Sequence, residues 1–191
     1  MITRESLLSL EEYARERPRF RARVIEHKKH RTLHLGEHVT LQFEDELTIR
    51  YQVQEMLRIE RIFEDEGIRG ELEAYTPLLP DGGNWKATMM IEYPDEAERR
   101  RMLGELRGIE RRVWAEVQGS ERVYAVADED LERENEEKTS SVHFLRFELP
   151  PSARERLRSG AALAFGVDHP HYAAAAQAAP RVRASLVSDL A

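Results

Sequence analysis

Histidines that could bind one metal ion together are the first candidates for chemistry in this sequence. His34 and His38 lie on either side of Gly36, in a stretch where apolar and polar residues alternate as in a β-hairpin. If residues 35–37 form the turn, the two histidines are direct cross-strand neighbours. His143 lies on another expected strand and could approach them. Because imidazole nitrogens bind zinc, iron, copper and nickel, His34, His38 and His143 are the candidate metal ligands.

The histidines also have structural interpretations that need no metal. A hydrogen-bonded strand position suits His143, and a helix cap suits the pair His169 and His171. A metal centre at the expected hairpin requires a third ligand, which Glu60 or His143 would have to supply. The sequence contains no HExxH-type spacing that would support a metal centre. A metal-dependent enzyme with His and Glu ligands therefore stays an alternative, and enzyme activity is left open.

A carboxylate on an expected apolar helix face is the next candidate. Residues 46–66 follow a helical period, with Gly67 as the expected end of the helix. At 100° per residue, the apolar face consists of Ile49, Val53, Met56 and Phe63. Glu60 falls within that face, where an unpaired charge would be costly, so we expect it to be buried and paired with Arg146. A general acid or base role is the alternative.

A glycine-rich loop precedes an expected strand within residues 80–95, PDGGNWKATMMIEYPD. Gly82 and Gly83 could turn their N–H groups toward an anion, with Lys86 adding charge. A strand follows, and neither GxxxxGK[ST] nor GxGxxG spacing is present, so we expect a tight turn against which Trp85 packs. The full set of candidate ligand-binding residues is Glu60, Arg146, Trp85, Lys86 and Arg50.

The elements that would position these residues indicate an α+β fold. Alternating patterns predict β-hairpins at residues 32–43 and 111–128, and further strands within residues 84–93, 141–150 and 161–168. The two hairpins are necessarily antiparallel. We therefore expect a mainly antiparallel sheet of about seven strands, with one long helix and several short helices.

Both ends of the chain are expected to be helical. A capping box at Ser9 predicts a helix from about Leu10, which Pro18 should break into two. The alanine-rich residues 168–191 predict a C-terminal appendage of two short helices, interrupted by Pro180.

Composition limits the classes of function. The chain has 191 residues, 41% of them hydrophobic and 34% charged, which suits a single folded α+β domain over residues 1–191. Without cysteine it forms no disulfide, thiolate nucleophile or cysteine-ligated metal centre. No stretch approaches the ~20 apolar residues of a membrane span, and the N-terminus lacks an apolar leader, so we expect a cytoplasmic protein with no membrane partner.

Opposite charges are separated along the chain, whose net charge is −7. Residues 14–31 carry eight basic and two acidic side chains, whereas residues 128–138 carry seven acidic and two basic ones. A site for RNA or another polyanion in the segment Arg15–Arg31 is one interpretation. Arginines at every second position spread around a helix, however, which favours solvated surfaces, and nucleic acid binding is not expected.

Four stretches resemble a known bacterial family. They are LGEHVTLQFEDELTIRYQVQEMLRIERIFEDEG, LPDGGNWKATMMIEYPDEAERR, EEKTSSVHFLRFEL and GVDHPHY. The family is the domain of unknown function 3501, and the similarity covers nearly the whole chain, weakest in the alanine-rich tail. The resemblance supplies no catalytic residue and no cofactor. It implies a redox setting with rubrerythrin-like or iron–sulfur proteins as partners.

These observations together favour an accessory or ligand-binding protein that works with such redox partners. The absence of a specific catalytic motif and the segregated charges support this expectation. Homo-oligomer formation and the identity of any cofactor are left open.

Overall fold

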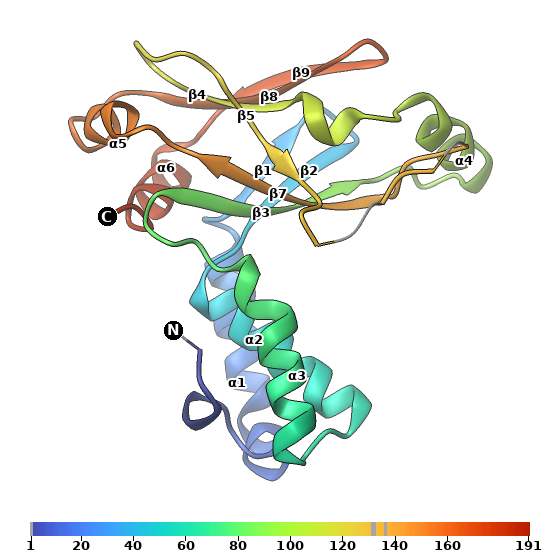
Figure 1. The fold of residues 1–191 in the computed structure, drawn as a ribbon, viewed down its shortest axis with the longest axis vertical. Coiled ribbons are helices and arrows are strands. Elements are labelled where there is room, and N and C mark those ends of the chain that lie inside the picture. Colours follow the sequence, from blue (N-terminus) through green and yellow to red (C-terminus); the bar gives the residue numbers. More distant parts are fainter. Residues whose placement is uncertain (1, 131–132, 136) are drawn as a thin grey trace. The chain divides into compact units, whose positions relative to one another are not determined.

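The computed structural model describes residues 2–130, 133–135 and 137–191, and the chain divides into two compact units (Figure 1). The described residues of Met1–His30 and Glu44–Leu79 form the helical unit. Those of Arg31–Phe43 and Pro80–Ala191 form the sheet unit. Each unit has its own hydrophobic core. The fold class is α+β, as predicted, whereas the single domain stays a prediction.

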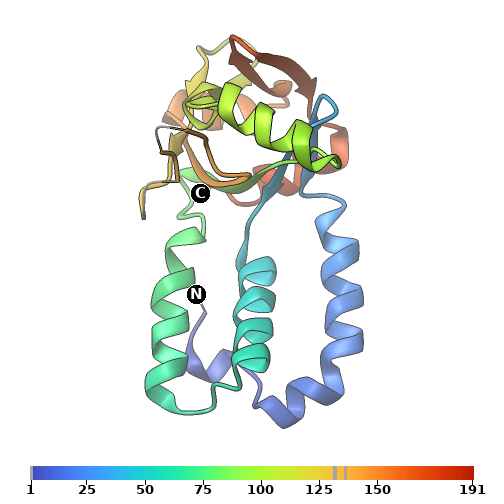
Figure 2. The same cartoon turned by 90° about the vertical axis from the view of Figure 1, so that its right-hand side faces the viewer.

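The helical unit consists mainly of α1 (Leu10–Lys28), α2 (Glu46–Glu60) and α3 (Asp65–Tyr75), which lie alongside one another (Figure 2). Short 3₁₀ turns span Arg4–Ser6 and Thr76–Leu78. The predicted capping box is present, since the Ser9 hydroxyl accepts a hydrogen bond from the Glu12 amide and the Glu12 carboxylate accepts one from the Ser9 amide. The core of this unit contains six buried residues: Ile2, Leu7, Ile49, Val53, Leu57 and Ile68.

Pro18 does not break α1, contrary to the prediction. It lies inside a continuous helix, where it lacks the N–H that would bond to the carbonyl of Ala14. Both residues are exposed, so water can solvate that carbonyl. Packing of Tyr13 and Val24, the buried residues of α1, holds the helix together across the proline.

The long helix predicted for residues 46–66 is wrong, because it is two helices. Arg61 adopts a left-handed conformation (φ 55°) and ends α2, and α3 begins at Asp65. Gly67 lies inside α3 rather than at a helix end, and a Cβ there would meet the Ile62 side chain at 2.6 Å. Phe63, placed by prediction on the buried face, falls in the connection and is 71% exposed.

The sheet unit contains two antiparallel sheets. The first has the strand order β1 (Thr32–Leu35), β2 (Val39–Phe43), β3 (Asn84–Ile91), β7 (Val142–Glu148) and β6 (Val126–Ala127). The second has the order β5 (Val123–Tyr124), β4 (Val113–Val117), β8 (Leu163–His169) and β9 (Tyr172–Gln177). The helices are α4 (Glu96–Glu105), the 3₁₀ turn Ile109–Arg112, α5 (Pro151–Arg158) and α6 (Pro180–Val187).

One hydrophobic core joins the two sheets. Side chains along β3 alternate between buried and half-buried, so Trp85, Ala87, Met89 and Ile91 share the core face. Phe165 of β8 lies at the centre of an aromatic cluster, with its ring 4.9 Å from Phe43, 5.6 Å from Phe147 and 5.7 Å from Trp85.

The first predicted hairpin is confirmed, but its turn differs from the prediction. Leu35 pairs with Val39 and His34 with Thr40, so residues 36–38 form the connection. Leu35 is fully buried, and a turn at residues 35–37 would have removed it from the core face. His34 and His38 are therefore not direct cross-strand neighbours.

The alanine-rich tail is not a helical appendage, contrary to the prediction. Tyr172–Gln177 is strand β9, which pairs with β8 along its whole length, and only Pro180–Val187 is helical. Tertiary pairing overrides the helix propensity of alanine here. The second predicted hairpin is confirmed, with Gly119 at φ 81° in its turn. Among the described residues, no helix has the length and apolarity that crossing a membrane demands.

Candidate ligand-binding pocket

A pocket of about 530 Å³ lies beside the β1–β2 hairpin in the sheet unit. It brings His34 of β1 and His38 of the hairpin connection together with Thr40 of β2. Its other polar lining residues are Glu92 and Tyr93, which follow β3, Arg99 of α4, Glu37 and Ser141. Antiparallel pairing of β2 with β3 places these segments together, because the start of β2 lies opposite the end of β3. We call this cavity the histidine pocket.

The His34 ring is oriented by a hydrogen-bond chain that ends on a carboxylate. The Thr40 hydroxyl donates to Glu92 Oε2 at 2.7 Å, and His34 Nδ1 lies 3.1 Å from the same hydroxyl oxygen. A hydroxyl has one proton, so here it must accept the proton of His34 Nδ1. In a neutral imidazole, this tautomer leaves Nε2 as an acceptor.

The His38 ring has different partners, but they also place the proton on Nδ1. Its Nδ1 lies 2.9 Å from the carbonyl oxygen of Glu92, which can only accept, so Nδ1 carries the proton. The ring stacks on Tyr93 with centroids 3.9 Å apart and planes inclined by 17°. Burial raises the pKa of the Tyr93 phenol, which therefore stays neutral and acts as an apolar support for the imidazole.

The pocket offers hydrogen-bond acceptors held in fixed orientations. No described residue is in hydrogen-bond contact with Nε2 of either histidine, and the Glu92 carboxylate lies beside them. Arg99 is anchored through Nη1 to the carbonyl oxygen of Tyr93 at 2.9 Å. Within the described part of the chain, no group of three His, Asp or Glu side chains is placed to hold a metal ion. The pocket therefore suits a polar organic ligand better than a metal.

His143 lies outside this pocket, in a buried hydrogen-bond network. Its Nδ1 is 2.6 Å from Asp128 Oδ2, and its Nε2 is 2.9 Å from the Thr139 hydroxyl. Asp128 also accepts a hydrogen bond from the Phe144 amide, with its own backbone in a left-handed conformation (φ 49°). Both ring nitrogens are thus engaged within the protein, which explains a fully buried histidine without a metal.

The expected partnership of Glu60 with Arg146 is wrong. Glu60 is exposed because it is the last residue of α2, where the apolar face has no further turn to support it. Arg146 forms ion pairs with Glu129 and Glu148 at 2.9 and 2.7 Å, and the hydrogen bonds that it donates to Glu129 raise the pKa of its guanidinium. Lys86 lies opposite Arg146 in the β3–β7 register, and burial lowers the pKa of its ammonium group.

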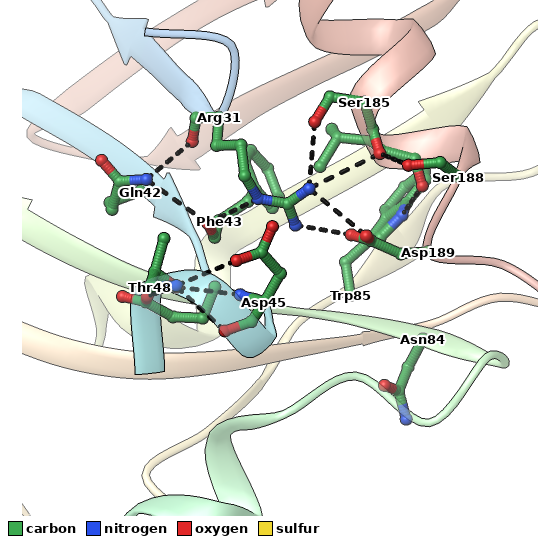
Figure 3. Close-up of polar contacts among 12 residues, drawn as sticks. Arg31, Gln42, Phe43, Asp45, Thr48, Asn84, Trp85, Ser185, Ser188 and Asp189 are labelled. Carbon is green, nitrogen blue, oxygen red and sulfur yellow. Dashed lines mark hydrogen bonds and ion pairs between the residues drawn. The ribbon is translucent and has the colours of Figure 1, made fainter. Parts of the chain in front are cut away.

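The other two candidate ligand-binding residues have structural contacts. Trp85 is fully buried, and its indole N–H donates to the carbonyl of Leu186 at 2.8 Å (Figure 3). The guanidinium of Arg50 lies over the Phe20 ring, 5.8 Å from its centroid. A ligand-binding role for either residue stays a prediction.

Comparison with known proteins places the chain in a family. The sequence profile described as "Protein of unknown function (DUF3501)" matches residues 1–190. This chain belongs to the DUF3501 family. A crystal structure of a novel protein of unknown function from Burkholderia pseudomallei is 56% identical, with a TM-score of 0.94 over 100% of this chain and 99% of the other. No curated protein matches the chain.

Several cations of the basic segment of this DUF3501 protein form ion pairs within the chain. Arg17 pairs with Glu55, Lys29 pairs with Glu26, and Arg31 is buried against Asp189. At least three of its eight cations are therefore neutralised within the chain, which weakens the polyanion interpretation. The acidic segment 128–138 includes Leu131, Glu132 and Glu136, which lie outside the described residues.

Sequence reasoning missed most of the histidine pocket of this DUF3501 protein. Thr40, Glu92, Tyr93 and Arg99 were not candidates, although the motif IEYP places a carboxylate and an aromatic ring directly after a buried strand. Polar residues at a strand end were the available signal. Their proximity to the hairpin depends on the pairing of β2 with β3, which no local pattern specifies.

Proposed function

We propose that this protein binds a small polar organic ligand in the histidine pocket. The observation that carries the proposal is the pair of imidazoles whose Nδ1 atoms are bound by protein oxygens, while no described residue is in hydrogen-bond contact with either Nε2 atom. Outer hydrogen bonds of this kind hold a ring in one orientation for a ligand on its other nitrogen. A pocket of about 530 Å³ is within the range of small-molecule sites.

The ligand should carry hydrogen-bond donors and one planar group. Two acceptor nitrogens and the Glu92 carboxylate favour amine, amide or hydroxyl donors. The His38 and Tyr93 rings form one stacked aromatic wall, against which a planar group can lie. Arg99, which donates a hydrogen bond to the Tyr93 carbonyl, lines the pocket and supplies a positive charge for an acidic substituent.

Histidine side-chain ¹⁵N NMR tests the proposal while polar metabolites, including purines and amino acids, are titrated into the full chain. Saturable shifts of the Nε2 resonances of His34 and His38 are expected. His38→Ala should abolish them, and His171→Ala, which alters an exposed histidine outside the pocket, should not. Absence of saturable shifts across the set, or binding that survives both His34→Ala and His38→Ala, contradicts the proposal.

A further inference from the structure

A second polar pocket of about 310 Å³ lies in the sheet unit, shares no lining residue with the histidine pocket, and contains a buried carboxylate. Glu110, in the 3₁₀ turn Ile109–Arg112, is only 3% exposed. The turn begins at Gly108 in a left-handed conformation (φ 79°), and its neighbour Ile109 is fully buried in the core. The chain therefore carries the Glu110 side chain inward with the apolar residue beside it.

The Glu110 carboxylate has fewer hydrogen-bond and ion-pair partners than a buried charge requires. Its Oε1 lies 3.3 Å from Nε of Arg111, whose side chain is 69% exposed, so solvent screens this ion pair. Its Oε2 is buried and has no hydrogen-bond partner among the residues that the structure describes. A buried carboxylate oxygen without a donor is costly, which indicates a group that completes it from outside the chain.

The other lining carboxylates give the pocket a negative charge but are already engaged. Five acids line it against the two bases Arg111 and Arg133; the acids are Glu110, Asp128, Glu129, Asp130 and Glu134. Asp128 holds His143, Glu129 pairs with Arg146, Asp130 pairs with Arg133, and Glu134 accepts from the Gly108 amide. Glu110 Oε2 is therefore the position at which a cation would find a free acceptor, within a field that attracts it.

We propose that this pocket binds the ammonium group of a small organic amine, with Glu110 Oε2 as its principal acceptor. An ammonium ion offers three N–H donors, so it can satisfy Oε2 and share its remaining protons with neighbouring carboxylates. A divalent metal suits the site less well, because the described residues contain no group of three ligands placed for one. The pocket has room for a short aliphatic chain behind the ammonium group.

Calorimetric titration of the full chain with putrescine, and with methylammonium as the smaller probe, tests the proposal. Saturable binding of the amine is expected. Glu110→Gln should weaken it by about tenfold or more, since a hydrogen bond to a charged group is lost. Glu121→Gln removes an exposed carboxylate outside the pocket and should leave binding unchanged. Thermal unfolding of both variants shows whether each retains the fold.

A second measurement keeps the test decisive if Glu110→Gln fails to fold. Backbone amide shifts of the wild-type protein during the putrescine titration should concentrate at residues 108–111 and 127–130. Shifts elsewhere, no saturable amine binding, or equal binding by Glu110→Gln would each overturn the proposal. Saturable binding of Ca²⁺ or Mg²⁺ without amine binding would overturn the ligand class.

Discussion

Glu55 is a carboxylate of the helical unit that is largely buried and has charged and hydroxyl partners. Its side chain is 13% exposed, and Arg17 donates two hydrogen bonds to it, at 2.8 and 2.9 Å. The Tyr13 hydroxyl donates a third, at 2.7 Å. The Arg17 hydrogen bonds, assisted by Tyr13, lower the pKa of Glu55 from 4.5 to about 2 despite its partial burial. Sequence periodicity directed attention to Glu60, five positions further on.

Glu55→Gln should lower the free energy of unfolding by about 1–3 kcal/mol at neutral pH, because Arg17 and Tyr13 lose a charged acceptor. The folded pKa lies below the unfolded one, so this stabilisation is complete above about pH 4.5 and is lost as the pH falls toward 2. Urea unfolding across that pH range checks whether the free energies of unfolding of the variant and the wild type converge as the pH falls. Glu60→Gln, at the exposed end of α2, should change little at any pH.

At the scale of the element, the boundary between α2 and α3 depends on one strained residue. Arg61 occupies the left-handed region at φ 55° and ends the helix, with its amide bonded to the Leu57 carbonyl. A non-glycine residue is uncommon there because its Cβ crowds the following carbonyl. The left-handed conformation of Arg61 turns the chain, and the side chain of Ile62 that follows packs against the core of the helical unit.

Arg61→Gly should stabilise the protein by about 0.5 kcal/mol, since relief of the left-handed strain exceeds the added entropy of the unfolded chain. Arg69→Gly is the matched control, because Arg69 is exposed but lies inside α3. There, glycine should cost about 1 kcal/mol. Chemical denaturation of both variants measures whether each change in the free energy of unfolding is positive or negative. Destabilisation by Arg61→Gly would show that the arginine side chain contributes a contact that outweighs its strain.

At the scale of the whole molecule, a buried arginine joins the two ends of the sheet unit's sequence, the first hairpin and the C-terminal segment. Arg31 is 1% exposed, and its Nη2 lies 2.5 Å from Asp189 Oδ2 (Figure 3). Its Nη1 donates to the Ser185 hydroxyl at 3.1 Å, and its Nε donates to the Phe43 carbonyl at 3.0 Å. One guanidinium thus joins the first hairpin to the end of the chain, 158 positions away in the sequence.

Asp189→Asn should lower the free energy of unfolding by about 1.5–3 kcal/mol, because the buried Arg31 guanidinium loses a charged hydrogen-bond acceptor. Arg31→Met together with Asp189→Leu removes both buried charges and should recover part of that loss. Urea unfolding measures both. Glu116→Gln, which breaks an exposed pair with Arg122, is the control and should cost less than about 1 kcal/mol. Equal effects in the buried and exposed pairs would contradict the expectation.

Local patterns in the sequence determined the α+β class, the family, the capping box at Ser9 and the second hairpin. These features depend on residues close together in the chain, through side-chain period, caps and turn glycines. The strands β3, β7 and β8 follow from their apolar residues for the same reason. The role of redox partners, the state of oligomerisation and the cytoplasmic location stay predictions.

Only the tertiary structure decided which polar residues meet. The histidine pocket depends on the register of β2 with β3, and the buried Glu110 depends on how the turn after Gly108 meets the core. The alanines of β9 form a strand because they pair with β8. Glu60 is exposed because α2 ends there, with Arg61 as its cap. A sequence records the preferences of each residue for its neighbours in the chain. Burial and pairing are set by contacts between distant segments, whose free energies exceed those local preferences.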